Sequence, residues 1–305
     1  MRIFVAGATG VLGRRAVAQL VSAGHDVTGV ARSEGKAAEL RAQGAAPATV
    51  DLFDRRAVAS AVAGHDAVCN LATHIPPVSR ASLPGAWATN DRLRSEASHN
   101  LAAGALTVGA SRFIQESITF LYPDCGDRWI DEDEPFEPVG FAQSVTRAEA
   151  AAAKFAAAGG TGVVLRFAMF YGPDSTHTLD AVKAARRRLA LFPGDPYGYL
   201  SSIHTDDAAT AVLAALGAPT GTYNIGDDEP VTRRVHADTL ADALTRPRLR
   251  IVPRALARLG GSKTALLTRS QRVSNGRFRQ LTPWAPAYPS VRDGLPAVAA
   301  ALART

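Results

Sequence analysis

The stretch "GATGVLG" at residues 7–13 constrains the fold of this chain more than any other feature. It follows the apolar run "RIFVA" and opens the amphipathic stretch "VLGRRAVAQLVSAG", so a glycine-rich turn joins a strand to a helix. Glycines let backbone N–H groups approach a pyrophosphate, and a helix N-terminus offers free donors and a positive dipole. This context predicts dinucleotide binding. The predicted contacts are Gly7, Thr9, Gly10, Val11, Leu12 and Gly13.

The alternation of strand and helix continues along the first half of the chain. Short apolar runs occur at "DVTGVAR", "APATVDL", "DAVCNLA", "RFIQES" and "GVVLRF", with stretches of helix length between them. Such spacing indicates βαβ units, in which helices cover both faces of a parallel sheet. Gly24 and Gly44 stand where the first two helices are expected to end. The sequence therefore predicts an α/β fold, a Rossmann-type doubly wound parallel sheet.

The rhythm loosens after "YGPD" at residues 171–174, where Pro and Gly become frequent. We expect residues 1–170, completed by about 200–226, to form the nucleotide-binding domain. Residues 171–199 and 227–305 are expected to form a small C-terminal substrate-binding lobe.

Several binding classes are not indicated. The net charge is +6, but the arginines are scattered, so a solvated basic surface is expected and no nucleic acid. Cys69 and Cys125 lack metal-ligand spacing, which predicts no metal site and fits a reducing compartment. No leader pattern and no apolar run near about 18 residues occurs, so we expect a cytoplasmic protein that does not contact a membrane.

The residues that follow the second to fourth strands favour NADP(H). An acid after the second strand would repel a 2′-phosphate, whereas this chain has Arg32, with Glu34 two residues further on. A solvated surface arginine is the alternative. Asp51 and Leu52 are predicted to reach the adenine. After the fourth strand, the nicotinamide side is predicted to be lined by Leu71, Ala72 and Thr73.

The chain resembles the extended short-chain dehydrogenases/reductases, a branch that includes sugar-nucleotide epimerases, dehydratases and ketoreductases. The likeness rests on "GATGVLG", "VCNLAT", "LRFAMFYGP", "IHTDDAATAV" and "GTYNIGDDEPVT", which together span nearly the whole chain. It implies a Rossmann domain with a small C-terminal lobe that closes over the substrate. Arg166, Asp206 and Asp207 fall in these motifs, and we expect structural roles for them, with an Asp capping the helix after "IHT".

The resemblance also implies a Ser or Thr and a Tyr-x-x-x-Lys pair, and this chain departs from both. Alignment on Tyr122 puts Ile118 at the Ser/Thr position, and alignment on Glu149 puts Phe141 and Val145 at the Tyr and Lys positions. No lysine lies four residues after any tyrosine, so no shift of register restores the pair. General acid help is typically worth about 10²–10⁴-fold, so the proton must come from elsewhere.

Three proton sources stay open: a protein group, a bound water, or a phenol beside the substrate carbonyl. Ser117 and His74 are the predicted protein donors, and Thr119 and Tyr122 are further candidates. An apolar pocket suits a flat aromatic ligand. Its predicted lining is Ile118, Phe141, Val145, Phe167, Met169, Phe170, Tyr197 and Tyr199.

These features predict an NADPH-dependent ketoreductase for a bulky aromatic, polyketide-like ketone. The pattern resembles atypical ketoreductases of antibiotic biosynthesis, the simocyclinone-type angucyclinone reductases among them. A non-catalytic NADP-binding sensor is the main alternative. A sugar-nucleotide epimerase or dehydratase fits less well because its reaction needs a protein base. The predicted partner is the small-molecule ketone alone, and monomer and homodimer both remain open.

Overall fold

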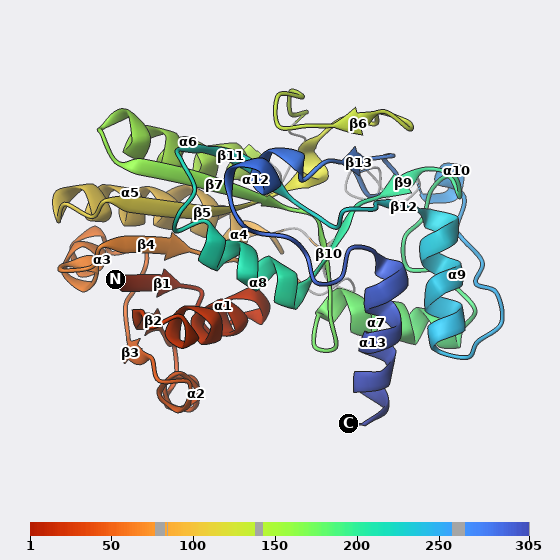
Figure 1. Cartoon of the computed structure of the whole chain (residues 1–305), viewed down its shortest axis with the longest axis horizontal. Coiled ribbons are helices and arrows are strands. Elements are labelled where there is room, and N and C mark those ends of the chain that lie inside the picture. The colour runs from red at the N-terminus through yellow and green to blue at the C-terminus, as the bar shows by residue number, and fades with distance from the viewer. Residues whose placement is uncertain (77–82, 84, 138–142, 258–265, 305) are drawn as a thin grey trace.

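The computed structural model describes residues 1–76, 83, 85–137, 143–257 and 266–304. Among these residues, seven parallel strands form a central sheet (Figure 1). In spatial order they are β11 (Gly221–Ile225), β7 (Thr161–Phe167), β5 (Arg112–Ile118), β4 (Ala67–Asn70), β1 (Arg2–Ala6), β2 (Asp26–Val30) and β3 (Ala46–Ala48). The predicted α/β class and doubly wound parallel sheet are confirmed.

Helices cover both faces of this sheet because its strands are apolar on both sides. One face buries the larger core cluster, which includes Val5, Leu20 and Val212. It is covered by α1 (Val11–Ser22), α2 (Glu34–Ala42), α8 (Thr205–Ala214) and α12 (Gly276–Leu281). The other face buries Phe4 and Phe113. It is covered by α3 (Arg55–Val62), α5 (Ser98–Thr107) and α6 (Gln143–Ala157), and α5 follows α4 (Ala88–Arg92) and a π-helical turn, Leu93–Ala97. α1 and α2 end two residues before Gly24 and Gly44, as predicted.

A second group of helices packs beside the sheet, at the right of Figure 1. It consists of α7 (Thr176–Arg186), α9 (Arg233–Ala243), α10 (Arg254–Ala257) and α13 (Val291–Ala303). A separate apolar cluster that includes Leu240 and Leu295 joins α7, α9 and α13. The predicted division into a nucleotide-binding domain and a lobe remains a prediction.

Short strand pairs connect the two parts. β8 (Met169–Tyr171) continues from β7 and pairs in parallel with β10 (Ser202–His204). β9 (Tyr199–Leu200) pairs antiparallel with β12 (Val231–Thr232), and β6 (Trp129–Ile130) pairs in parallel with β13 (Arg272–Val273). A 3₁₀ turn, Thr119–Leu121, follows β5. After β7 the chain leaves the carboxyl edge of the sheet through β8 and enters α7 of the second helix group.

Candidate active site

The glycine turn between β1 and α1 lies at the carboxyl edge of the sheet, beside the end of β4. Gly7 has a φ of +78°, and a Cβ there would lie 2.5 Å from the carbonyl oxygen of Leu71. A Cβ on Gly13 would lie 2.0 Å from the carbonyl oxygen of Gly7, so the turn requires both glycines. Gly10 begins α1 without a side-chain cap, which leaves the first N–H groups of the helix free for an anion.

This turn also marks the point where the strand order reverses. β1 lies between β4 and β2, and ligands of open parallel sheets bind at such a point, beyond the carboxyl ends of the strands. Thr9 and Val11 are half-buried there, Gly10 is exposed, and Leu12 packs into the core. These residues fit a dinucleotide pyrophosphate, which is the cofactor group predicted for them.

Arg32 is exposed just after β2, and its side chain makes no ion pair or hydrogen bond with any described residue. The neighbouring acid is committed elsewhere, because Glu34 Oε1 accepts from Arg41 Nη1 at 2.6 Å. After β3, Asp51 is exposed and accepts from the backbone N–H of Phe53. Arg32 is thus an unpaired charge among the described residues, two positions after the end of β2, as a 2′-phosphate site needs.

A buried amide fixes the end of β4. Asn70 Nδ2 donates to Ser98 Oγ and to Gln115 Oε1, at 2.9 Å each, and Asn70 Oδ1 accepts from the N–H of Ala72 at 3.2 Å. Leu71 packs into the core and Thr73 is exposed. The predicted nicotinamide-side residues therefore follow a strand end that buried hydrogen bonds hold in place.

A buried polar network lies where β5 and β7 end. Ser117 Oγ donates to Glu149 Oε1 at 2.5 Å, and Arg166 binds both oxygens of Glu149 at 2.9 and 2.8 Å. Arg166 Nη1 donates to the hydroxyl of Tyr122 at 2.7 Å, and that hydroxyl donates to Asn224 Oδ1 at 2.8 Å. Burial raises the pKa of Tyr122 to about 12, so its hydroxyl stays protonated at neutral pH.

This network engages the hydroxyl groups of two candidate proton donors. Ser117 and Tyr122 are fully buried and their hydroxyls already donate inside the protein, and Thr119 is buried as well. Nothing in the sequence indicated that Ser117 would pair with Glu149. Because the Ser117 hydroxyl donates its hydrogen bond to Glu149, that hydrogen is not free for a substrate. His74 is exposed, and its backbone N–H donates to Asn90 Oδ1. The predicted roles of Ser117 and His74 as proton donors remain predictions.

Hydrocarbon side chains fill the described positions at which the family resemblance expects catalytic groups. Ile118 is half-buried and Val145 is buried, and both pack in one small cluster with Leu121 and Phe136. Phe141 lies outside the described residues. Neither described position offers a hydroxyl or an amino group.

Two small neighbouring cavities lie between β8, β9 and α9, and each encloses about 10 Å³, room for about one water molecule. Met169 and Tyr199 of the predicted pocket line the first cavity. Phe167 and Phe170 instead pack together in the main core with ring centroids 5.3 Å apart, because their side chains face α8 and the sheet. Tyr197 is 79% exposed and lines neither cavity.

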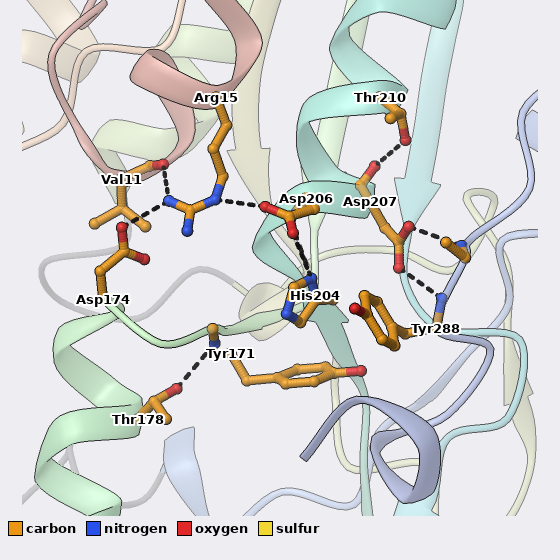
Figure 2. Close-up of polar contacts among 12 residues, drawn as sticks. Val11, Arg15, Tyr171, Asp174, Thr178, His204, Asp206, Asp207, Thr210 and Tyr288 are labelled. Carbon is orange, nitrogen blue, oxygen red and sulfur yellow. Dashed lines mark hydrogen bonds and ion pairs between the residues drawn. The ribbon is translucent and has the colours of Figure 1, made fainter. Parts of the chain in front are cut away.

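Ion pairs tie α1 to the segments around it (Figure 2). Arg15 Nε donates to Asp206 Oδ1 at 2.7 Å and Arg15 Nη1 donates to Asp174 Oδ2 at 2.8 Å. The expectation that an Asp caps α8 was wrong, since His204 precedes the helix and its Nδ1 accepts from the N–H of Asp206. Asp207 accepts instead from backbone N–H groups of residues 287 and 288, so it holds the segment before α13.

Arg233 is a buried residue beside both cavities that the sequence analysis did not single out. It begins α9, is only 2% exposed and lines both cavities. A signal for it exists, because Arg233, His236, Ala237 and Leu240 follow the i, i+3, i+4, i+7 spacing of a buried helix face. An arginine on such a face is uncommon and indicates a special environment.

None of the described helices combines the length and apolar character needed to cross a bilayer.

Comparison with known proteins agrees with this architecture. The family model described as NAD dependent epimerase/dehydratase family matches residues 3–226. The chain is 35% identical over 308 residues to the 3-diazoavenalumate denitrifying reductase of a Streptomyces species, covering 97% of this chain and 99% of the relative. It is 29% identical to the 4-hydroxy-2-methyl-3-oxo-4-farnesyl-3,4-dihydroquinoline-1-oxide ketoreductase of Stigmatella aurantiaca, covering 77% of this chain and 70% of that enzyme.

A solved structure supports the same fold. The crystal structure of human epimerase family protein SDR39U1 with NADPH superposes with a TM-score of 0.81 at 22% identity. The superposition covers 98% of this chain and 99% of the human one. With the family model matching well over half of its length, this chain belongs to the NAD-dependent epimerase/dehydratase family.

Proposed function

We propose that this protein is an NADPH-dependent oxidoreductase that reduces an aromatic diazo carboxylate and releases dinitrogen. One observation carries the proposal: among the described residues, the end of β5 offers no free protein acid. Positions 118, 141 and 145 carry Ile, Phe and Val, and the hydroxyls of Ser117 and Tyr122 donate within the buried network. The reaction should therefore be one that needs hydride and no proton from the protein.

Reductive loss of dinitrogen meets that requirement. In the net reaction of an arenediazonium group, the hydride electron pair forms a C–H bond, the C–N bond breaks, and its electron pair leaves on dinitrogen. No proton is consumed, whereas reduction of a ketone takes up one proton with each hydride. A general acid typically contributes about 10²–10⁴-fold, so its loss penalises the ketone reaction and leaves the diazo reaction unaffected.

The Streptomyces relative supports this choice. Its name specifies a diazo group, an acid anion and a denitrifying reduction, and the two chains align over nearly their full lengths. Aromatic side chains, namely Phe120, Phe192 and Tyr199, line the first cavity, so a conjugated ligand that extended to its edge would contact aromatic rings.

The residues that would hold the cofactor fit NADPH. The glycine turn and the free N–H groups of α1 suit its pyrophosphate, and the unpaired Arg32 suits its 2′-phosphate. When bound, NADPH supplies the hydride. The buried amide of Asn70 and the Glu149–Arg166 pair keep the strand ends rigid, so that a ligand is held in one orientation.

A stoichiometry assay tests the proposal. The purified protein is given NADPH and 3-diazo-4-hydroxycinnamate labelled with nitrogen-15, and NADPH oxidation, labelled dinitrogen and the arene product are measured together. We expect one dinitrogen and one arene for each NADPH oxidised, with the single proton that the ring oxygen gains taken from water. Reactions without protein correct for direct reaction of the diazo compound. NADPH oxidation no faster than in that control would refute the proposal.

Ketone reduction is the second candidate, and the Stigmatella ketoreductase favours it. In that case a phenol beside the carbonyl would supply the proton, as expected for an aromatic polyketide-like ketone. The same assay with hydroxylated and methylated aryl ketones separates the two reactions, because ketone turnover forms one alcohol per NADPH and releases no dinitrogen. Tight NADPH binding without turnover of either class would favour a cofactor sensor.

A further inference from the structure

A buried arginine without a counter-charge lies at the boundary of the two cavities. Arg233 Nη2 donates to the carbonyl oxygens of Leu267 at 2.9 Å and Arg269 at 2.6 Å. Its Nε and Nη1 are buried and have no hydrogen-bond partner among the described residues. An unpaired buried guanidinium is costly, because it has lost its hydration without gaining full compensation.

The neighbouring carboxylates do not serve Arg233. Asp124 pairs with Arg254 at 3.0 Å, and Glu137 pairs with Arg269 at 2.9 Å. Asp195 Oδ1 accepts from the backbone N–H of residue 197, within its own turn. Burial lowers the pKa of Arg233 to about 10, which still leaves the group charged at neutral pH. Arg233 is therefore a buried charged group without direct contact to a carboxylate of the described residues, and Asp124 and Asp195 act on it only at longer range.

Arg233 lies beside two small cavities that are lined mostly by apolar side chains. The first cavity is lined by Phe120, Met169 and Leu200 beside Arg233, and the second by Leu191 and other apolar groups. The loop before β9 approaches the guanidinium closely, since a Cβ at residue 198 would lie 2.7 Å from its Nη1. A space of about 10 Å³ accepts one oxygen atom and no bulky group.

The first cavity is lined in part by residues that follow two strands of the central sheet. Phe120 lies in the 3₁₀ turn that follows β5, and Met169 begins β8 directly after β7. Both strands end at the edge where the glycine turn and the end of β4 lie. A slender conjugated ligand can thus have its ring near the strand ends and its acidic end in the lobe.

We propose that Arg233 binds the carboxylate of the substrate and selects for acids over their neutral esters. The proposal rests on the proposed function for the identity of the substrate, but the binding step is independent of the diazo chemistry. A carboxylate oxygen would supply both the missing acceptor and the missing counter-charge. Arg233 is then a specificity-determining residue of an enzyme for aromatic acids.

Binding of two matched probes tests this inference without turnover. Dissociation constants of 4-hydroxycinnamate and its methyl ester are measured by calorimetry in the presence of NADP⁺. A charge-assisted hydrogen bond predicts that the wild type prefers the acid by about tenfold or more. In Arg233→Gln the preference should fall to near one, and Arg233→Lys should keep part of it. Arg248→Gln, an exposed arginine change in the same lobe, should leave it unchanged.

The outcomes separate the two proposals. Equal binding of acid and ester by the wild type, or an unchanged preference in a folded Arg233→Gln, overturns the carboxylate site. If Arg233→Gln does not fold, the Arg233→Lys variant is decisive. A reduced preference for the acid supports the site, and an undiminished preference overturns it because the guanidinium group is then not used. Acid preference without diazo turnover would refute the proposed reaction and leave the carboxylate site standing.

Discussion

Under the proposed preference for NADPH, replacement of Arg32 by alanine should give a protein that no longer distinguishes the two nicotinamide cofactors. Arg32 is exposed after β2 and unpaired among the described residues, while Glu34 is engaged by Arg41. A hydrogen bond to a charged group contributes about 1.5–3 kcal/mol, and exposure to solvent moves this toward the lower limit. We therefore expect KM for NADPH to rise about tenfold in Arg32→Ala, with kcat nearly unchanged.

The assay is initial-rate kinetics with NADPH and NADH at saturating substrate, together with titration of each cofactor by calorimetry. KM for NADH should stay within about twofold of wild type, because no 2′-phosphate is present to lose a contact. Glu34→Gln is the matched control, and it should leave the NADPH constants unchanged. Equal effects of Arg32→Ala on both cofactors would refute the reasoning, since they would indicate a structural role for Arg32 or a contact shared by NADH and NADPH.

Three further predictions concern the buried network, the lobe and the missing acid. Glu149→Gln leaves the charge of Arg166 buried and unpaired, so urea unfolding should show a loss of about 3–5 kcal/mol, and a loss below about 1 kcal/mol would contradict this. Burial lowers the pKa of His236 from 6.5 to about 4, so the folded protein binds fewer protons than the unfolded chain within that window. The contribution of His236 to the free energy of unfolding should therefore fall by about 3 kcal/mol from pH 6.5 to pH 4. Unfolding experiments at several pH values should show that this decrease is missing in His236→Gln. Phe141→Tyr should change the rate of dinitrogen release by less than about threefold, and a gain near the 10²-fold typical of general acids would show that a proton limits the reaction.

The parallel sheet was predictable because its signals are local. Each strand is a short apolar run, and the turn at Gly7 combines a strand, glycines and a helix within a few residues. The helix ends before Gly24 and Gly44 follow from the same local chemistry. Such features depend on side chains and backbone conformations that neighbours in sequence determine, so one sequence is enough to find them.

The details of the site were less predictable because they depend on contacts across the chain. Ser117 meets Glu149 from 32 residues away, and Tyr122 meets Asn224 from 102 residues away. His204 caps α8 although Asp206 and Asp207 stand beside it, because their carboxylates bind other segments. No local pattern records which of several polar groups will be taken by a distant partner.

Under the proposed function, two arginines without a carboxylate partner among the described residues would take over part of the role of a protein acid. Arg32 follows β2 and Arg233 begins α9, and Figure 1 shows these elements on opposite sides of the molecule. A cofactor phosphate at one and a substrate carboxylate at the other would fix both reactants by their ends, and orientation alone can supply about 7–11 kcal/mol of a barrier. The two arginines would then contribute, by orienting the reactants, part of the rate enhancement that the family resemblance assigns to Tyr and Lys. On this reasoning, loss of either arginine should slow the reaction of dilute reactants far more than restoring Tyr at position 141 could accelerate it.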